Sequence, residues 1–279
     1  MKLRTRAVHL VAAVILAMAG LTLAVPGRAL DINGFMPERG HGDLAVSYTS
    51  ETYDEFWVGE TKVSDPGVGK VDLKSTSFWT QWGLTDNLAL VAALPYIDAS
   101  SNGLGGFEDS GLQDLAVLLK YRFFSSGPNH LVAGFGVRTP VTDYEANLPV
   151  DLGDGTTDFL FRLVYQYQTD HFYFSQQVGY DVRNKDAPDD YPLFTEIGYT
   201  AGRITYSAYY SRLIADGGTD IGDPGFTFPS NQEEYSKAGV KLYARLTDRF
   251  GLSALYFDTL DGRNTGDSHG FSGGLVFRF

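Results

Sequence analysis

The sequence predicts an all-β protein, a transmembrane antiparallel β-barrel of about twelve strands. Large apolar side chains take every second position in segment after segment, which is the period of a strand with one apolar and one polar face. The connections between these segments alternate between short turns and long loops, as in barrels that cross a membrane. The chain also ends on such a segment, residues 270–279, rather than on a polar tail.

The C-terminal segment places Phe271, Leu275, Phe277 and Phe279 on one set of alternate positions. An unpaired apolar edge of this kind promotes aggregation, which disfavours the alternative of an edge strand in a soluble β-sandwich. A barrel instead pairs its last strand with its first. A final strand with alternating aromatics and a terminal Phe also resembles the signal for the outer-membrane assembly machinery, so we expect Phe277 and Phe279 to be that assembly signal.

The N-terminal segment, residues 1–29, has the layout of a secretory signal peptide. Lys2, Arg4 and Arg6 precede a mostly apolar run, and small residues up to Ala29 offer a cleavage site. No later segment has the roughly 18 continuous apolar residues of a membrane helix. We therefore expect a cleaved signal peptide (1–29), a periplasmic or lumenal lead segment (30–40) and a barrel (41–279) in the outer membrane of a Gram-negative bacterium.

Composition agrees with this class of protein. A mean hydropathy of −0.14 is too polar for a helical membrane protein, whereas 17 Tyr, 19 Phe and 32 Gly suit a sheet rich in aromatics and turns. Without residues 1–29 the chain has 18 basic and 34 acidic residues, a formal net charge of −16, which disfavours nucleic acid as a partner. No Cys is present for a lipid anchor or a disulfide. The expected partners are outer-membrane lipid, lipopolysaccharide and a small-molecule solute.

The predicted strands follow one another along the whole barrel region. They cover residues 41–53, 71–84, 88–96, 112–124, 130–138, 158–168, 172–181, 191–199, 204–210, 237–246, 252–256 and 270–279. Short turns are expected near Asp86, Gly127, Asp170, Gly202 and Asp248, and long loops near Gly59, Gly105, Leu148, Lys185, Ile221 and Arg263. An even strand number places the first and last strand ends on the periplasmic side.

The polar face of each strand is expected to line the lumen, and the apolar face to contact lipid. The predicted lumen-lining residues are Asp114, Lys120, Arg122, Arg138, Asp158, Arg162, Gln166, Gln177, Asp181, Glu196, Lys241, Arg245 and Arg278. These residues carry both signs of charge. They either line a selective path for a small solute or pair with one another and fill the interior.

Most acidic residues fall in the long loops, where a solvated acidic rim is the favoured interpretation. The alternative is that loop carboxylates bind divalent cations that bridge to lipopolysaccharide phosphates. Two groups were weighed for this role: Asp151, Asp154 and Asp158, and Asp216, Asp220 and Asp223. Neither has the spacing of a calcium loop, so no metal site and no cofactor are predicted.

An enzymatic barrel is a competing class, because some outer-membrane barrels carry a nucleophile and a base at the rim. Ser268 and His269 lie near the expected outer rim, but the His-x-Ser-Asn-Gly phrase of outer-membrane phospholipases is absent. We therefore predict a protein that is not an enzyme. A structural or adhesive barrel with a closed lumen is the stronger alternative.

Several phrases resemble a known family. Residues 83–88 (GLTDNL) run into residues 93–96 (ALPY), and residues 111–115 (GLQDL) and 120–123 (KYRF) follow. Together with the terminal strand, they resemble the outer-membrane proteins grouped as the putative MetA-pathway phenol-degradation family. The resemblance implies a channel-like protein, and the expected function is passive or facilitated passage of small solutes, aromatic or hydrophobic compounds among them.

Overall fold

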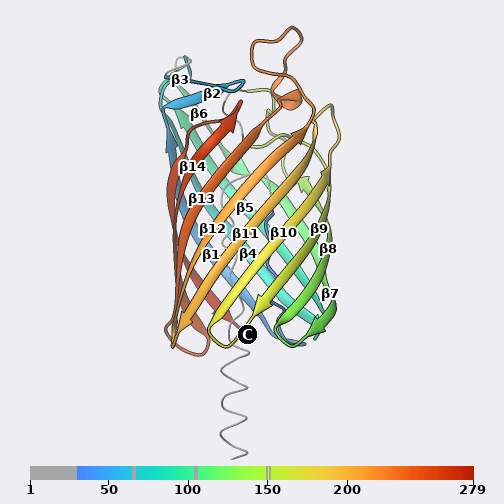
Figure 1. The fold of residues 1–279 in the computed structure, drawn as a ribbon. Coiled ribbons are helices and arrows are strands. Elements are labelled where there is room, and N and C mark those ends of the chain that lie inside the picture. The colour runs from blue at the N-terminus through green and yellow to red at the C-terminus, as the bar shows by residue number, and fades with distance from the viewer. Residues whose placement is uncertain (1–29, 65–66, 104–105, 149, 151) are drawn as a thin grey trace, which may run out of the picture.

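The computed structural model describes residues 30–64, 67–103, 106–148, 150 and 152–279, and in these residues the chain forms a closed barrel (Figure 1). Twelve strands make its wall: β1 (Gly42–Tyr53), β4 (Val71–Thr85), β5 (Leu88–Ser101), β7 (Asp114–Ser126), β8 (Asn129–Pro140), β9 (Asp158–Gln168), β10 (Phe172–Val182), β11 (Asp189–Ala201), β12 (Ile204–Asp216), β13 (Glu234–Arg245), β14 (Phe250–Arg263) and β15 (His269–Arg278). The predicted fold class is confirmed.

Every wall strand pairs antiparallel with its neighbours, and the sheet closes on itself. The closing seam joins the first and last strands, with Ala45 opposite Val276 and Asp43 opposite Arg278. β1 also pairs with β4, so none of these strands has a free edge. A closed sheet satisfies its backbone hydrogen bonds internally, which is the condition for crossing lipid with strands.

The connections divide the barrel into two ends, which we call the turn end and the loop end, at the bottom and top of Figure 1. The turn end carries the predicted short turns, such as the one between β11 and β12 at Gly202 (φ 62°). The loop end carries a small hairpin of β2 (Glu55–Val58) and β3 (Thr61–Ser64), and a short 3₁₀ helix, η1 (Phe228–Ser230). Two of the expected long loops, residues 183–188 and 264–268, are shorter than predicted, because β10 ends later and β11 begins earlier around the first and β14 extends further before the second.

One predicted strand is divided. Residues 112–124 were expected to be continuous, but β6 (Phe107–Leu112) and β7 are separated at Gln113 and pair with different parts of β5. Pro95 lies on β5 between the two paired stretches and has no N–H to donate. Its carbonyl accepts from the Gln113 N–H (3.0 Å) instead. β5 therefore continues past the predicted end at residue 96 and pairs with β6 as far as Ser101.

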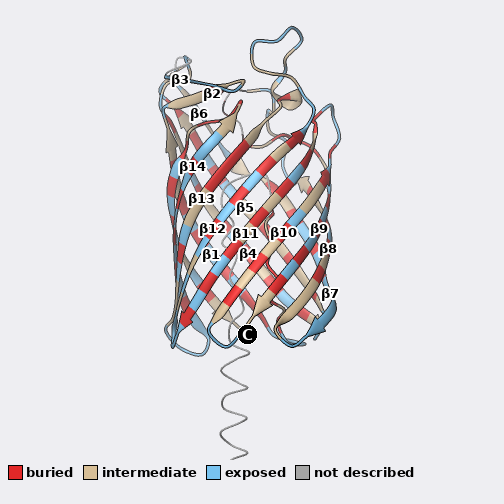
Figure 2. Ribbon diagram, in the orientation of Figure 1, coloured by how far each residue is buried: buried red, intermediate tan, exposed pale blue. Residues whose placement is uncertain are grey.

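The two faces of the wall have inverted polarity. Figure 2 shows buried and exposed residues alternating along the strands. The exposed positions are apolar, as at Leu163 (47% exposed) and Val240 (58%), whereas Lys120 and Gln166 on the inward face are fully buried. A water-soluble protein has the opposite arrangement, so this outer surface fits a hydrocarbon surrounding. Among the described residues, no helix has the length and apolar character needed to span a membrane.

The lead segment lies inside the barrel. The chain turns at the turn end, where Gly40 (φ 79°) donates its N–H to the Gly83 carbonyl and Arg39 donates its N–H to Asp86. From there, residues 30–37 extend into the lumen, where Leu30 and Ile32 pack in an apolar cluster with wall residues such as Trp79 and Leu118. This segment fills the turn-end half of the interior.

Candidate functional site in the lumen

The backbone of the lead segment is held mainly by neutral side chains of the wall. Gln177 accepts from the Ile32 N–H (2.7 Å), and Gln166 accepts from the Gly34 N–H (2.9 Å). Lys120 donates to the Phe35 carbonyl (2.7 Å) and to Gln81 Oε1 (2.8 Å). An extended segment without strand neighbours needs such partners, because an unsatisfied buried peptide group is costly.

Close packing also fixes the segment against β9. A methyl group at position 34 would overlap with Cβ of Gln166, so only glycine fits between the segment and the wall. On the neighbouring strand β10, the ring of Tyr173 meets that of Phe35 edge-on, with centroids 4.9 Å apart. The segment therefore has one defined position in the lumen.

A cluster of ion pairs lines β8 to β11. Arg138 pairs with Asp158 (Nε to Oδ2, 2.8 Å), and Arg162 pairs with Asp181 (Nη2 to Oδ2, 3.0 Å). Arg183 contacts Asp154 and Asp190. All these side chains are buried. Buried charges need partners of this kind because desolvation penalises an isolated ion, so the pairs fill this part of the wall rather than leave it free for a solute.

A second type of cluster lies on β1 and β11 to β14 and combines lysine with aromatic rings. Lys241 donates to Glu196 (3.2 Å) and lies 4.8 Å from the centroid of the Tyr209 ring. Lys237 donates to Glu51 (3.1 Å) and lies 5.1 Å from the centroid of the Tyr235 ring. Ammonium groups over ring faces gain cation–π attraction in addition to the ion pair. The lysine cluster thus offers aromatic ring surfaces to the lumen, whereas the cluster of ion pairs on β8 to β11 does not.

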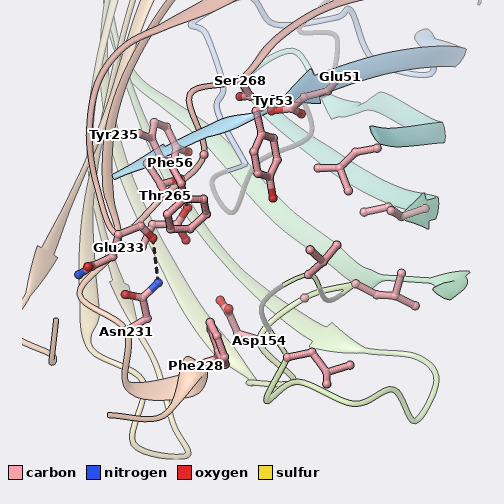
Figure 3. Close-up of a pocket in the computed structure, with 18 of the residues that line it drawn as sticks. Glu51, Tyr53, Phe56, Asp154, Phe228, Asn231, Glu233, Tyr235, Thr265 and Ser268 are labelled. Atoms are coloured by element: carbon pink, nitrogen blue, oxygen red, sulfur yellow. Dashed lines mark hydrogen bonds between the residues drawn. The ribbon is translucent and has the colours of Figure 1, made fainter. Parts of the chain in front are cut away.

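A cavity of about 190 Å³ opens in the lumen at the loop end. Figure 3 shows rings and carboxylates pointing into it, among them Tyr53, Phe56, Phe228, Glu51 and Glu233. Its floor and walls come from β1, β4, β5 and β13, and loop residues close its sides. We call this cavity the vestibule.

Two contacts of the loops at this end change the pKa of the groups involved. Burial and the neighbouring Asp114 carboxylate raise the pKa of the Tyr144 hydroxyl far above its usual value, and this hydroxyl donates to Asp114. The Arg263 guanidinium hydrogen-bonds Asp220 and lowers the pKa of that carboxyl. The second pair attaches the loop of residues 217–233 to the end of β14 (Nη2 to Oδ2, 2.6 Å).

The predicted lumen-lining residues fall into three groups by what they contact. Lys120, Gln166, Gln177 and Arg162 contact the lead segment. The ion-pair and lysine clusters contain the residues Arg138, Asp158, Asp181, Glu196 and Lys241. The remaining four, Asp114, Arg122, Arg245 and Arg278, lie toward the ends of their strands.

The residues near the strand ends bond locally. Arg122 is half-buried at the turn end and donates to Asn87 (3.0 Å) and to the Asp86 carbonyl (2.8 Å). Arg278 donates to Asp43 across the seam (3.2 Å). Arg245 is half-buried beside the turn that joins β13 and β14.

Sequence reasoning did not select three inward residues that contribute to these clusters: Glu51, Arg183 and Asp190. Glu51 is on the inward phase of β1, so the alternation of residues 41–53 carried a signal for it. Arg183 follows β10 directly and Asp190 is the second residue of β11, so both lay outside the predicted strand bounds.

The two carboxylate groups considered as cation ligands have several of their described members in contact with arginine instead. Among the described residues, no cluster of three or more His, Asp or Glu side chains has the arrangement to hold a metal ion. Asp154 and Asp158 are bound to arginines and Asp220 to Arg263, while Asp151 lies outside the described residues. Ser268, directly before β15, is buried, whereas His269, the first residue of β15, is exposed. The two neighbouring side chains therefore lie in different surroundings.

Comparisons with known proteins agree with this architecture. The sequence profile of the family described as "Putative MetA-pathway of phenol degradation" matches residues 59–275. No curated protein matches the chain.

Solved structures of several barrels are similar to this one. An outer membrane channel from Pseudomonas putida F1 has a TM-score of 0.72 at 16% identity, over 91% of this chain and 100% of that chain. The translocator domain of the autotransporter NalP from Neisseria meningitidis has a TM-score of 0.53 at 10% identity, over 99% and 96% of the two chains. The NanC porin has a TM-score of 0.50 at 10% identity, over 83% and 98%. At such identities the likeness establishes the fold, that of an outer-membrane barrel.

Proposed function

The chain belongs to the family described as the putative MetA pathway of phenol degradation, and from this premise we propose that it is an outer-membrane channel for small solutes. In this proposal the loop end faces outward and the turn end faces the periplasm, as in other barrels of this kind. The solutes are small enough to enter through the vestibule. The lead segment is the gate that controls the turn-end half of the lumen.

One observation carries the proposal: a chain segment outside the wall lies in the turn-end half of the lumen. In a barrel closed for structural purposes, wall side chains alone can pack the interior. Here Gln81, Gln166 and Gln177 bond to the lead segment, and only the Glu38–Gly40 turn joins that segment to β1. Withdrawal of the segment leaves a lumen lined by these glutamines and by the apolar wall residues that now pack on Leu30 and Ile32, with every strand pair intact.

The proposal also covers the surroundings of the barrel. The exposed apolar belt contacts outer-membrane lipid, and the acidic loops face lipopolysaccharide. Phe277 and Phe279 act as the assembly signal: their rings stack at the turn end with centroids 6.3 Å apart, next to the seam. Deletion of Phe279 should lower the amount of folded protein in the outer membrane far more than truncation of an external loop does. Equal effects of the two changes would contradict this role.

The function is tested by single-channel recording in planar bilayers. The intact protein should show low or intermittent conductance, and a variant lacking residues 30–36 should show a steady conductance several-fold higher, because the obstruction is gone. A variant in which these residues are kept but the loop of residues 217–233 is shortened is the control, and it should keep the gated behaviour.

A closed structural barrel is the second candidate, and the apolar packing of Leu30 and Ile32 in the lumen favours it. This function predicts no conductance and no solute uptake into liposomes for either protein. A folded, silent deletion variant would therefore replace the channel proposal with the structural one.

A further inference from the structure

The vestibule combines apolar, aromatic and polar walls in one small volume. Leu73 and Ile97 supply aliphatic surface from β4 and β5, and the rings of Tyr53 and Phe56 lie 6.1 Å apart (centroid to centroid) on another side (Figure 3). Its volume of about 190 Å³ suits a compound with a single ring, since an engineered protein cavity of roughly 150 Å³ binds benzene.

Two buried polar atoms of the vestibule have no hydrogen-bond partner among the described residues. Asn231 is 6% exposed, and its side-chain nitrogen donates to the Asn264 carbonyl (3.1 Å), which fixes the amide orientation and leaves Oδ1 without a partner in this part of the chain. Ser75 is 3% exposed, and its hydroxyl makes no hydrogen bond to the residues that the structure describes. Burial without a partner is costly for such groups, so a ligand that supplies a hydrogen-bond donor gains what the protein alone lacks.

The charge on the vestibule wall favours a cation over an anion. Glu51, Asp154 and Glu233 line the space together with one ammonium group, that of Lys237. Lys237 is bound to Glu51, and Arg183 binds Asp154 from outside the cavity. The carboxylates repel an anionic solute, and the exposed ring faces attract an ammonium group by cation–π interaction.

From these contacts we infer that the vestibule is a binding site for small aromatic amines in their protonated form. The ring lies among the apolar and aromatic side chains, and the ammonium group donates to the two oxygens that have no partner within the described part of the chain, Asn231 Oδ1 and Ser75 Oγ, and faces the carboxylate side. This inference rests on the proposed function and names the class of solute that the loop end selects. Aromatic carboxylates of the same size are disfavoured at the entrance.

The experiment measures binding to the folded, full-length barrel by calorimetry in detergent, which does not depend on conduction. Three matched probes are titrated at neutral pH: benzylamine, benzyl alcohol and benzoate. Benzylamine should bind most tightly, benzyl alcohol more weakly because it keeps the donor but lacks the charge, and benzoate least. Benzoate binding as tight as that of benzylamine would overturn the inference, as would the absence of benzylamine binding.

Two variants separate the polar contacts from the charge. Ser75→Ala removes a hydroxyl that the ligand-free protein does not use, so stability should be unchanged while benzylamine affinity falls about fivefold. Glu233→Gln should weaken benzylamine binding but leave benzyl alcohol binding within about twofold, since only the cation senses the lost charge. Glu60→Gln is the control, because Glu60 is exposed outside the vestibule. If neither vestibule variant differed from this control, the site assignment would be wrong.

The outcomes for this site and for the channel are distinguishable. Conductance without benzylamine binding would leave the channel proposal standing and remove the vestibule site. Binding without conductance in the intact protein or in the variant lacking residues 30–36 would support the site and remove the channel proposal.

Discussion

The two faces of β9 differ in polarity: the outward face is apolar and meets lipid, and the inward face is polar and meets the lumen. Phe159, Phe161 and Leu163 point outward and are 48%, 44% and 47% exposed, whereas Arg162 and Gln166 point inward and are 3% and 0% exposed. The outward face needs only an apolar surface of suitable height, so many sequences satisfy it. The inward face is excluded from bulk water, so each polar group there depends on one particular partner. The strand thus tolerates change on its lipid face and is specific on its lumen face.

The hydrogen-bond partners of the inward residues of β9 change along the strand. Arg162 bonds both to Asp181 on the neighbouring strand and to the Leu30 carbonyl of the lead segment (3.2 Å). Gln166 lies four residues further along β9 toward the turn end and accepts a hydrogen bond from the Gly34 N–H of the segment. Removal of the segment therefore leaves the ion pair of Arg162 in place but takes away that partner of Gln166.

The largest expected effect comes from Arg162→Ala. The change leaves the Asp181 carboxylate buried without its guanidinium, which should lower the free energy of unfolding by about 3–5 kcal/mol. Urea unfolding in lipid vesicles measures this loss. The double variant Arg162→Met with Asp181→Leu should recover most of it, because no charge is then buried alone. A loss of less than about 1 kcal/mol for the single variant would mean that water reaches this pair.

The next largest effect tests the lipid face. Leu163→Arg places a charge near the middle of β9 against hydrocarbon and should cost about 2–4 kcal/mol of folding free energy. Ile204→Arg is the matched control: Ile204 is also exposed but lies beside the short turn at Gly202, where the cost should be about 0–1 kcal/mol. Equal costs at both positions would contradict the placement of the membrane on the barrel.

A smaller effect is expected for Gln166→Leu. The Gly34 N–H loses its acceptor, which should weaken docking of the lead segment by about 1–3 kcal/mol while the strand pairs remain. Single-channel recordings should show open periods that are more frequent, roughly tenfold for each 1.4 kcal/mol. Gln168→Leu at the end of the same strand should not change gating. If both variants gate alike, Gln166 does not hold the segment.

The smallest effect comes from an ion pair outside the membrane region. The side chains of Arg263 and Asp220 are 24% and 27% exposed, so their pair should contribute at most about 1 kcal/mol, in contrast to the buried pair of Arg162. Because folding lowers the pKa of Asp220, the contribution is complete above the unfolded value of about 4 and is lost as the pH falls through the lower folded value. Proteolysis of residues 217–233 should accelerate over that range. Asp220→Asn should abolish the dependence on pH.

Most strands of the barrel wall could be predicted from the sequence. The alternation of residues such as 158–168 predicts both the strand and its inward face, since lipid imposes an apolar side at every second position. The sequence could not predict which inward charges pair with each other. The pairing of Arg162 with Asp181 depends on the register between β9 and β10, and no local sequence pattern determines that register. The lead segment was expected in either the periplasm or the lumen. It lies in the lumen but has no periodicity, since its contacts are spread over β4, β7, β9 and β10 rather than along one partner strand.

The close approach of Gly34 to Gln166 has a consequence for how such a sequence can drift. A substitution to alanine preserves polarity, size class and hydrogen-bonding groups, yet its methyl group occupies the space of the Gln166 Cβ. Selection for a closed resting state would therefore disfavour any side chain larger than the hydrogen atom of glycine at this position. Related sequences that no longer require closure can have alanine or serine there. Glycine at the position of residue 34 is therefore expected in those relatives whose lead segment still closes the lumen.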